Sequence, residues 1–457
     1  MCYDGFMQNT NQETKLHIFK ALVTLSIPTI LEEMLATLLQ YVDTAMVGQL
    51  GENATAAVSV TTTITWLVGS ICSALGIATL SMISKAVGSG DKERIRRISS
   101  QVLMLAVWCG VIVGGVSMLL SPYIPIWMGA EEEIQKQASL YFFIISVPMV
   151  FRACNSILGA SIRATKDTKT PMFINLGANL LNVVLNYLLI YPAGLGVTGA
   201  AIASAISYTL SGCCMFIAYR RNQLLRWEWK SFRVDRDILA DCAKLSIPVL
   251  ATNVTSCLGY VVFASLVTGM GTTIFAAHSI AVTAETIFYI PGYGLRTATS
   301  TLVGISLGEG NRKKFENISF ISVLLTMGMM VLSGVVLYLT AYPLMCLFTN
   351  SATVAGIGAG MLRLVAFSEP FFGLMVVMEG IYYGLGRTKY TFWVTTFSMW
   401  GVRILFTWIC VEIWQLGLTE VWYCMIADNV CKAVLLALPV LSAKRRRVLF
   451  PIAETLE

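Results

Sequence analysis

The sequence predicts an all-α polytopic membrane protein with about twelve transmembrane helices in two six-helix repeat lobes. Of its 457 residues, 56% are hydrophobic and only 13% are charged, which excludes a soluble globular domain. The apolar runs are long and are separated by short loops with charged residues, Gly or Pro, whereas a β-barrel would show alternation over about ten residues. An internal repeat at a fixed offset divides the chain in two.

Apolar runs of membrane-spanning length predict the helices in order along the chain. The expected spans are 22–47, 56–83, 98–121, 139–160, 172–192, 199–219, 238–268, 276–303, 318–341, 359–384, 391–412 and 419–441. Met1–Lys20 is polar, and the first apolar run continues directly into a span. We therefore expect no cleavable signal peptide.

Basic residues concentrate in alternate loops, which predicts the topology. The basic side holds Lys85, Lys92, Arg94, Arg96, Arg97, Arg163, Lys166, Lys169, Arg220, Arg221, Arg226, Lys230, Arg233, Arg236, Arg312, Lys313, Lys314, Arg387, Lys389 and Lys444–Arg447. The opposite loops contribute essentially Lys136 alone, beside Glu131–Glu133. By the positive-inside rule, both termini are expected in the cytoplasm of a bacterial inner-membrane protein. The net charge of +6 thus reflects topology, and we expect no nucleic-acid partner.

Cysteine and histidine usage argues against a disulfide framework and a zinc site. The twelve cysteines are scattered, mostly inside apolar runs and without repeated CxxC spacing, and only two histidines are present. Neither pattern provides the ligand spacing of a structural metal centre.

The internal repeat has an offset of 220 residues. LSIP at Leu25–Pro28 matches LSIP at Leu245–Pro248, and the match continues without a gap until Gly90 meets Gly310. We therefore expect an N-terminal lobe (1–218), a basic cytoplasmic linker (219–237), a C-terminal lobe (238–441) and a basic tail (442–457). Parallel repeats of this kind carry substrate at their interface and work by alternating access.

The first span carries ionisable groups at membrane depth, which are functional by default. Within Leu25–Gly51 lie Glu32, Glu33, Gln40 and Asp43. At about 100° per residue, Glu32, Gln40 and Asp43 share one helical face, and this face cannot point at lipid.

Asp43 and an asparagine stripe on the fifth span form the candidate cation site. The stripe is Asn175, Asn179, Asn182 and Asn186. Asp43 and Asn186 lie at similar distances from the outer ends of their spans, so their depths agree within about one turn. A carboxylate among amides can load and release H⁺ or Na⁺; the alternatives are a packing carboxyl and plain interhelical hydrogen bonds. Asn155 on the fourth span is a further candidate ligand.

The second repeat departs from the first in its charges. At the repeat offset, Glu32, Glu33 and Asp43 become Thr252, Asn253 and Phe263, so we expect no cation site on the seventh span. The acids lie elsewhere, at Glu285, Glu369, Glu379 and Asp428. Lys432 is four residues from Asp428 and is expected to pair with it structurally.

A substrate cavity for a flat hydrophobic cation would need acids and aromatic faces. The candidates that we assign to it are Glu32, Gln40, Tyr41, Trp66, Glu285 and Glu369. Glu369 precedes Pro370 in the outer half of its span and is the stronger second-repeat candidate.

Several motifs resemble those of the multidrug and toxin extrusion (MATE) transporters. They are VDTAMVGQLG, VGSGDKERIRR, LGEGNRKKF, SILGASIRATKDTKTP, GLGVTGAAIA and MGTTIFAAHSIAV. The resemblance implies a V-shaped pair of lobes that exports organic cations by cation antiport. It also implies that Asp43 is the coupling carboxylate and that Asn182 and Asn186 are polar ligands. The chain departs from members that carry a second carboxylate where Asn186 stands, and from relatives with a glutamate where Ser256 stands.

The expected function is export of amphipathic organic cations coupled to inward H⁺ or Na⁺, with Na⁺ at Asp43 if sodium is the ion. No other cofactor is expected, and the protein should act as a monomer in the lipid bilayer. The alternatives are a flippase for lipid-linked precursors, which needs a basic cavity, and a channel, against which the two-lobed repeat argues. A polytopic enzyme would need paired carboxylates at a membrane face, so we expect no enzyme.

Overall fold

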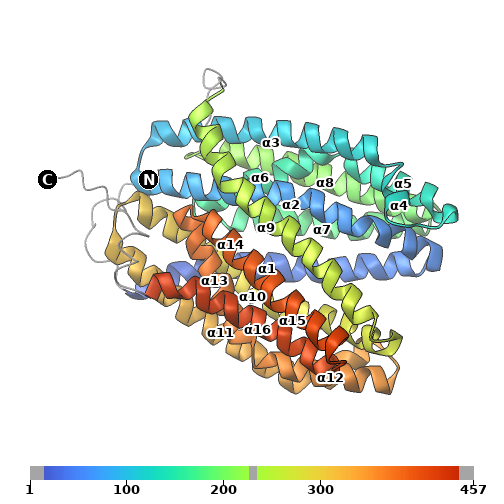
Figure 1. The fold of residues 1–457 in the computed structure, drawn as a ribbon. Coiled ribbons are helices and arrows are strands. Elements are labelled where there is room, and N and C mark those ends of the chain that lie inside the picture. The colour runs from blue at the N-terminus through green and yellow to red at the C-terminus, as the bar shows by residue number, and fades with distance from the viewer. Residues whose placement is uncertain (1–14, 226–233, 442–457) are drawn as a thin grey trace. The chain divides into compact units, whose positions relative to one another are not determined.

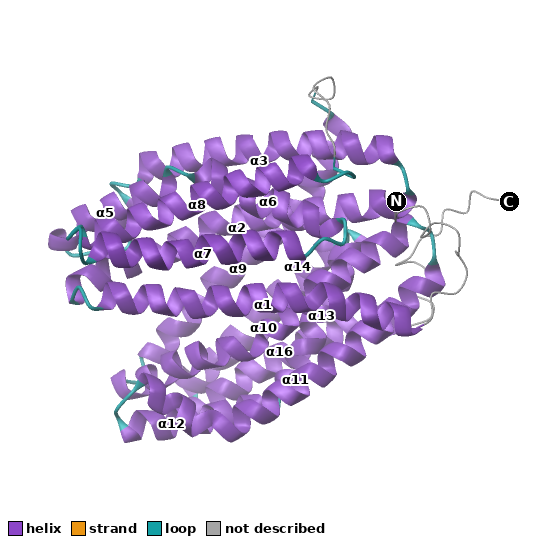
Figure 2. Ribbon diagram, turned by 180° about the vertical axis from the view of Figure 1, so that it is seen from behind, coloured by secondary structure: helices purple, strands orange, loops and turns teal. Residues whose placement is uncertain are grey.

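The computed structural model describes residues 15–225 and 234–441, and these residues form helices and short connections without any strand (Figures 1 and 2). The prediction of an all-α fold is confirmed. The predicted tail and residues 226–233 of the predicted linker lie outside the described residues.

Two series of helices follow each other along the chain (Figure 1). The first is α1 (Lys15–Gly48), α2 (Glu52–Ser89), α3 (Lys92–Leu120), α4 (Ile124–Trp127), α5 (Glu132–Ser146), α6 (Met149–Ala164), α7 (Lys169–Ile190) and α8 (Gly196–Arg221). The second is α9 (Arg236–Thr268), α10 (Thr272–Gly308), α11 (Arg312–Phe348), α12 (Ala352–Ala366), α13 (Glu369–Leu385), α14 (Thr388–Ser398), η3 (Met399–Ile404), α15 (Leu405–Trp408), η4 (Ile409–Ile413) and α16 (Leu418–Leu441). Here η marks π-helical turns.

The offset of 220 residues holds far beyond the matching letters. It relates the first residues of α2 and α10, of α3 and α11, of α5 and α12, and of α6 and α13. The sequences of these later helices differ strongly, yet their first residues repeat at the same offset. The repeat is therefore a property of the backbone.

Ten helices of the described chain are long and apolar enough to cross a membrane, and two bent pairs bring the total to twelve. The pairs are α5 with α6, bent by 51°, and α12 with α13, bent by 57°. Each pair falls on a range that we predicted as a single span. The bends have a local cause, because Pro148 precedes α6 and Pro370 lies in the first turn of α13, and proline cannot donate a backbone hydrogen bond to the preceding turn.

The described chain divides into two compact units that differ from the predicted lobes at α1, α9 and α14. The 261–385 unit holds the residues up to Ile30, Val261–Leu385 and those from Phe397 onward. The 31–260 unit holds Leu31–Tyr260 and Gly386–Thr396. The lobe boundaries of the sequence stay a prediction.

The core of the 31–260 unit lies where α6 packs against α2, α3 and α8. Gly212 makes this packing possible, since a Cβ there would come within 2.3 Å of the Phe151 carbonyl oxygen. Arg97 of α3 pairs with Asp235 just before α9. This hydrogen-bonded ion pair holds the pKa of Asp235 below its usual range.

The core of the 261–385 unit is built by α10, α11, α12, α13 and α16. Trp422 is its largest fully buried side chain. The α10–α13 contact is close enough that a Cβ on Gly380 would lie 2.6 Å from the Arg296 carbonyl oxygen. The start of α1 also belongs here, because Ile30 packs directly on Gly294.

Candidate functional site

Asp43 of α1 and Asn186 of α7 meet in the 31–260 unit. The Asn186 amide donates to Asp43 Oδ1 and also to Asn182 Oδ1, at 3.2 Å. Asn182 in turn donates to Ser204 Oγ of α8 at 3.3 Å. The site is thus a polar chain across three helices that begins at a carboxylate.

The local sequence explains this arrangement. Asn182 and Asn186 are four residues apart, so they lie on one face of α7. Asn186 is fully buried and Asp43 is partly buried. The two predicted depths therefore agree, as the hydrogen bond between them requires.

Two amide oxygens in this unit could bind a cation. Asn186 Oδ1 and Asn155 Oδ1 are both buried and have no hydrogen-bond partner. Oxygen ligands of this kind suit a hard cation such as Na⁺. Among the described residues, no hydrogen bond joins Asn155 of α6 to Asp43. The described chain also lacks any cluster of three His, Cys, Asp or Glu side chains for a metal ion, so a cation at Asp43 would depend on amide, hydroxyl and backbone oxygens.

Glu32 lies on the same helix as Asp43 but in a different environment. Arg163 Nη2 donates to Glu32 Oε1 at 2.6 Å, and Asn175 Nδ2 donates to the same oxygen at 2.5 Å. Glu32 is 8% exposed. Its charge is therefore already compensated inside the unit.

The remaining first-repeat cavity candidates are more accessible than Glu32. Gln40 is exposed, Tyr41 is half-buried and Trp66 is 48% exposed. The structure gives each a surface that a ligand could contact, and their cavity role stays a prediction.

Glu285 of α10 and Glu369 of α13 form a buried acid pair in the 261–385 unit. Both side chains are buried, and neither Glu369 oxygen has a hydrogen-bond partner. Glu379 differs, because Arg296 Nη1 lies 3.2 Å from its Oε2. Two of the three acids are thus uncompensated by a direct ion pair.

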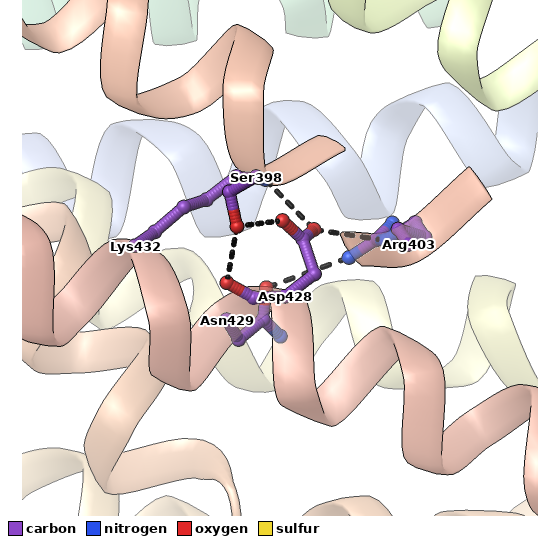
Figure 3. A network of polar contacts seen from close by, with 5 residues as sticks. All are labelled: Ser398, Arg403, Asp428, Asn429 and Lys432. Carbon is purple, nitrogen blue, oxygen red and sulfur yellow. Dashed lines mark hydrogen bonds and ion pairs between the residues drawn. The ribbon is translucent and has the colours of Figure 1, made fainter. Parts of the chain in front are cut away.

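Asp428 of α16 is surrounded by cations and donors (Figure 3). Lys432 Nζ lies 2.8 Å from its Oδ2, Arg403 Nε lies 2.9 Å from the same oxygen, and Ser398 Oγ lies 2.6 Å from its Oδ1. The predicted Asp428–Lys432 pair is confirmed. Arg403 also lies over the Phe263 ring at 5.6 Å.

Comparisons with known proteins decide the family. The sequence profile of the MatE family matches residues 28–188 and 248–409, one copy in each repeat. The chain belongs to the MatE family. A probable multidrug resistance protein NorM of Thermotoga maritima is 27% identical over 455 residues, covering 97% of each chain. The multidrug resistance protein PmpM of Pseudomonas aeruginosa is 24% identical and covers 88% of this chain and 85% of its own.

A solved MATE structure shares the fold of this MatE chain. It is described as the outward-facing conformation of a multidrug resistance MATE family transporter of the MOP superfamily, and it superposes with a TM-score of 0.89 at 24% identity over 94% of this chain and 96% of its own. The family match in both repeats confirms the resemblance seen in the motifs. The MatE chain is a multi-pass membrane transporter and not an enzyme.

Some contacts around the candidate site residues of this MatE chain were missed from the sequence. Arg163 was interpreted only as a topology signal, although it pairs with Glu32. Ser204 was not predicted, and the sequence did not assign Arg403 to a particular acid. Arg403 lies in η3 and Asp428 in α16, so no helical spacing links the two residues.

Proposed function

We propose that this MatE chain is a secondary antiporter that exports amphipathic organic cations across a bacterial cytoplasmic membrane, driven by inward H⁺ or Na⁺ that binds at Asp43. The observation that carries this proposal is the chemistry around Asp43. Its hydrogen-bond partner is the neutral amide of Asn186, and it takes part in no ion pair among the described side chains. A membrane carboxylate without a fixed counter-ion can accept an exchangeable one.

The ligands follow from the same site. Asn182 and Asn186 would supply oxygens for the coupling ion, and Asn155 is a third candidate because its amide oxygen is buried without a partner. In this proposal the ion is cargo that crosses the membrane. An ion moving inward through 100 mV releases about 2.3 kcal/mol, which suffices for modest export without ATP.

Gln40, Tyr41 and Trp66 are proposed to contact the exported cation, because they combine exposed aromatic faces with polarity. Glu285 and Glu369 are proposed as acidic cavity groups of the other unit, since both are buried and neither forms an ion pair among the described side chains. The monomeric state and the cytoplasmic termini belong to the same proposal.

Accumulation of ethidium inside everted vesicles, which corresponds to export from the cell, tests the coupling role. Vesicles with an imposed pH gradient or an imposed Na⁺ gradient are compared for wild type, Asp43→Asn and the control Glu52→Gln, an exposed carboxyl at the start of α2. We expect Asp43→Asn to lower gradient-driven export about tenfold or more, while the control exports normally. Wild-type rates for Asp43→Asn under both gradients would overturn the proposal, and the gradient that drives wild-type export identifies the ion.

A further inference from the structure

Helix α1 passes from one compact unit to the other within a single turn. Ile30 is the last residue that belongs with the 261–385 unit, and a Cβ on Gly294 would come within 2.4 Å of its side chain. From Leu31 onward the helix belongs with the 31–260 unit. Pro28 lies in the same turn and removes one backbone hydrogen bond there. The backbone hydrogen-bond ladder of α1 is therefore interrupted about one turn before Glu32.

Glu32 provides the polar attachment that follows this crossover. Its Oε1 accepts from Arg163 at the end of α6 and from Asn175 of α7, at 2.6 and 2.5 Å. These bonds tie α1 to two helices of its own unit. Any bending at Pro28 would therefore meet a fixed point one turn later.

The same two helices meet again at the candidate cation site. Asp43 is eleven residues beyond Glu32 on α1, and Asn186 is eleven residues beyond Asn175 on α7. Eleven residues make about three turns, so both contacts use the same face of each helix. Two carboxylate–asparagine contacts thus join α1 to α7 in one register, and Arg163 adds a cation to the first of them.

The contact of Glu32 with Arg163 and Asn175 fixes the register of the helices more than it stabilises the fold. Both donors share Oε1, whereas Glu32 Oε2 and Arg163 Nε are buried without hydrogen-bond partners. A buried ion pair loses much of its attraction to desolvation, and apolar side chains usually hold helices as well or better. The best-attested use of such a pair is to fix register.

We propose that Arg163 and Asn175 are positioning residues, which hold α1 in register with α7 through Glu32 so that Asp43 meets Asn186. The contribution to transport rests on the proposed function of Asp43. The register itself does not, because it concerns the geometry of two helices only.

The experiment uses the full-length protein in three forms: wild type, Arg163→Met, and the double variant Glu32→Gln with Arg163→Met. Arg163→Met leaves Glu32 charged and buried, so it destabilises the fold by itself. The double variant removes both charges, and its thermal unfolding temperature should return close to the wild-type value. A role in charge balance alone would then predict restored export.

Two readouts separate positioning from mere stability. Bioorthogonal spin labels at the exposed positions Thr44 and Tyr187 report the distance between α1 and α7 beside Asp43. We expect a broadened distance distribution in the double variant and ethidium export about tenfold or more below wild type. Arg163→Lys, which keeps the charge, should retain a narrow distribution and most of the export.

The outcomes have distinct meanings. A double variant that exports at the wild-type rate, or one whose distance distribution matches wild type, would overturn the positioning role. Normal coupled export by Asp43→Asn together with a broadened distribution in the double variant would overturn the proposed coupling acid and support the register role of Arg163.

Discussion

Positions 43 and 263 are equivalent in the two repeats, yet they carry different charges. Position 43 is an acidic side chain, whereas position 263 is an uncharged ring that lies beside a basic side chain. Asp43 is a carboxylate whose partner is the neutral amide of Asn186. Phe263 is an aromatic ring beneath the guanidinium of Arg403, which is itself bound to Asp428. At the first site no fixed counter-ion from the described part of the chain neutralises the carboxylate, so an exchangeable cation can bind there. In the second, the chain supplies a permanent cation of its own.

A second pair of equivalent positions shows the same divergence. In the first repeat, α2 and α6 approach through Gly76, where a Cβ would lie 3.3 Å from Ala160 Cβ. At the repeat offset the residue is Arg296, which pairs with Glu379 at 3.2 Å. A common backbone plan therefore supports small-residue packing in one repeat and an ion pair in the other.

The largest expected effect comes from removing Asp428, the acid that binds the fixed cations Arg403 and Lys432. We call these three residues the permanent site. Asp428→Asn leaves Arg403 and Lys432 buried without their shared carboxylate (Figure 3), which should lower the free energy of unfolding by about 3–5 kcal/mol. Thermal unfolding in detergent, followed by tryptophan fluorescence, measures this. Adding Lys432→Met should recover part of the loss. An unchanged unfolding temperature in Asp428→Asn would refute the contrast between a permanent and an exchangeable site.

An intermediate effect is expected at the exchangeable site. Asn186→Leu removes the hydrogen bond to Asp43 and should lower coupled export about tenfold, because a hydrogen bond to a charged group contributes about 1.5–3 kcal/mol. Ethidium accumulation inside everted vesicles measures the change. Asn179→Leu, about two turns earlier on the same asparagine stripe, is the matched control and should export normally. Equal losses in both variants would mean that the stripe acts as a whole and that Asn186 has no special place.

The smallest effect sharpens the contrast within the permanent site. Ser398→Ala removes one donor to Asp428, but Lys432 and Arg403 remain, so the free energy of unfolding should fall by only about 1 kcal/mol. The same unfolding assay checks this, and export should be unaffected. A loss as large as that of Asp428→Asn would show that the serine, rather than the two cations, holds the acid in place.

Sequence reasoning was strongest where periodicity and offset carry the signal. The spans, the repeat and the i, i+4 pair of Asp428 and Lys432 follow from regular helical geometry. The Asp43–Asn186 contact could be anticipated because both residues lie at similar depths in spans that run in the same direction. These inferences need no knowledge of how helices pack side by side.

The rest depended on packing that one sequence does not encode. Arg163 follows its helix into a basic loop, so nothing in the letters distinguishes a side chain that turns inward toward Glu32 from one that faces the cytoplasm. The bends inside the predicted spans 139–160 and 359–384 were also missed, because hydropathy continues across Pro148 and Pro370. A sequence shows where charged and apolar residues lie along the chain. The direction in which a side chain or a helix points depends on the helices packed against it.

The shared positions of the two helix breaks separate the course of the backbone from the placement of charge. Helices α6 and α13 begin at the same offset, although the ion pairs around them differ between the repeats. The bend in each pair therefore does not require a particular set of charged side chains. A charge can be moved or removed in either repeat while the helix break stays where it is.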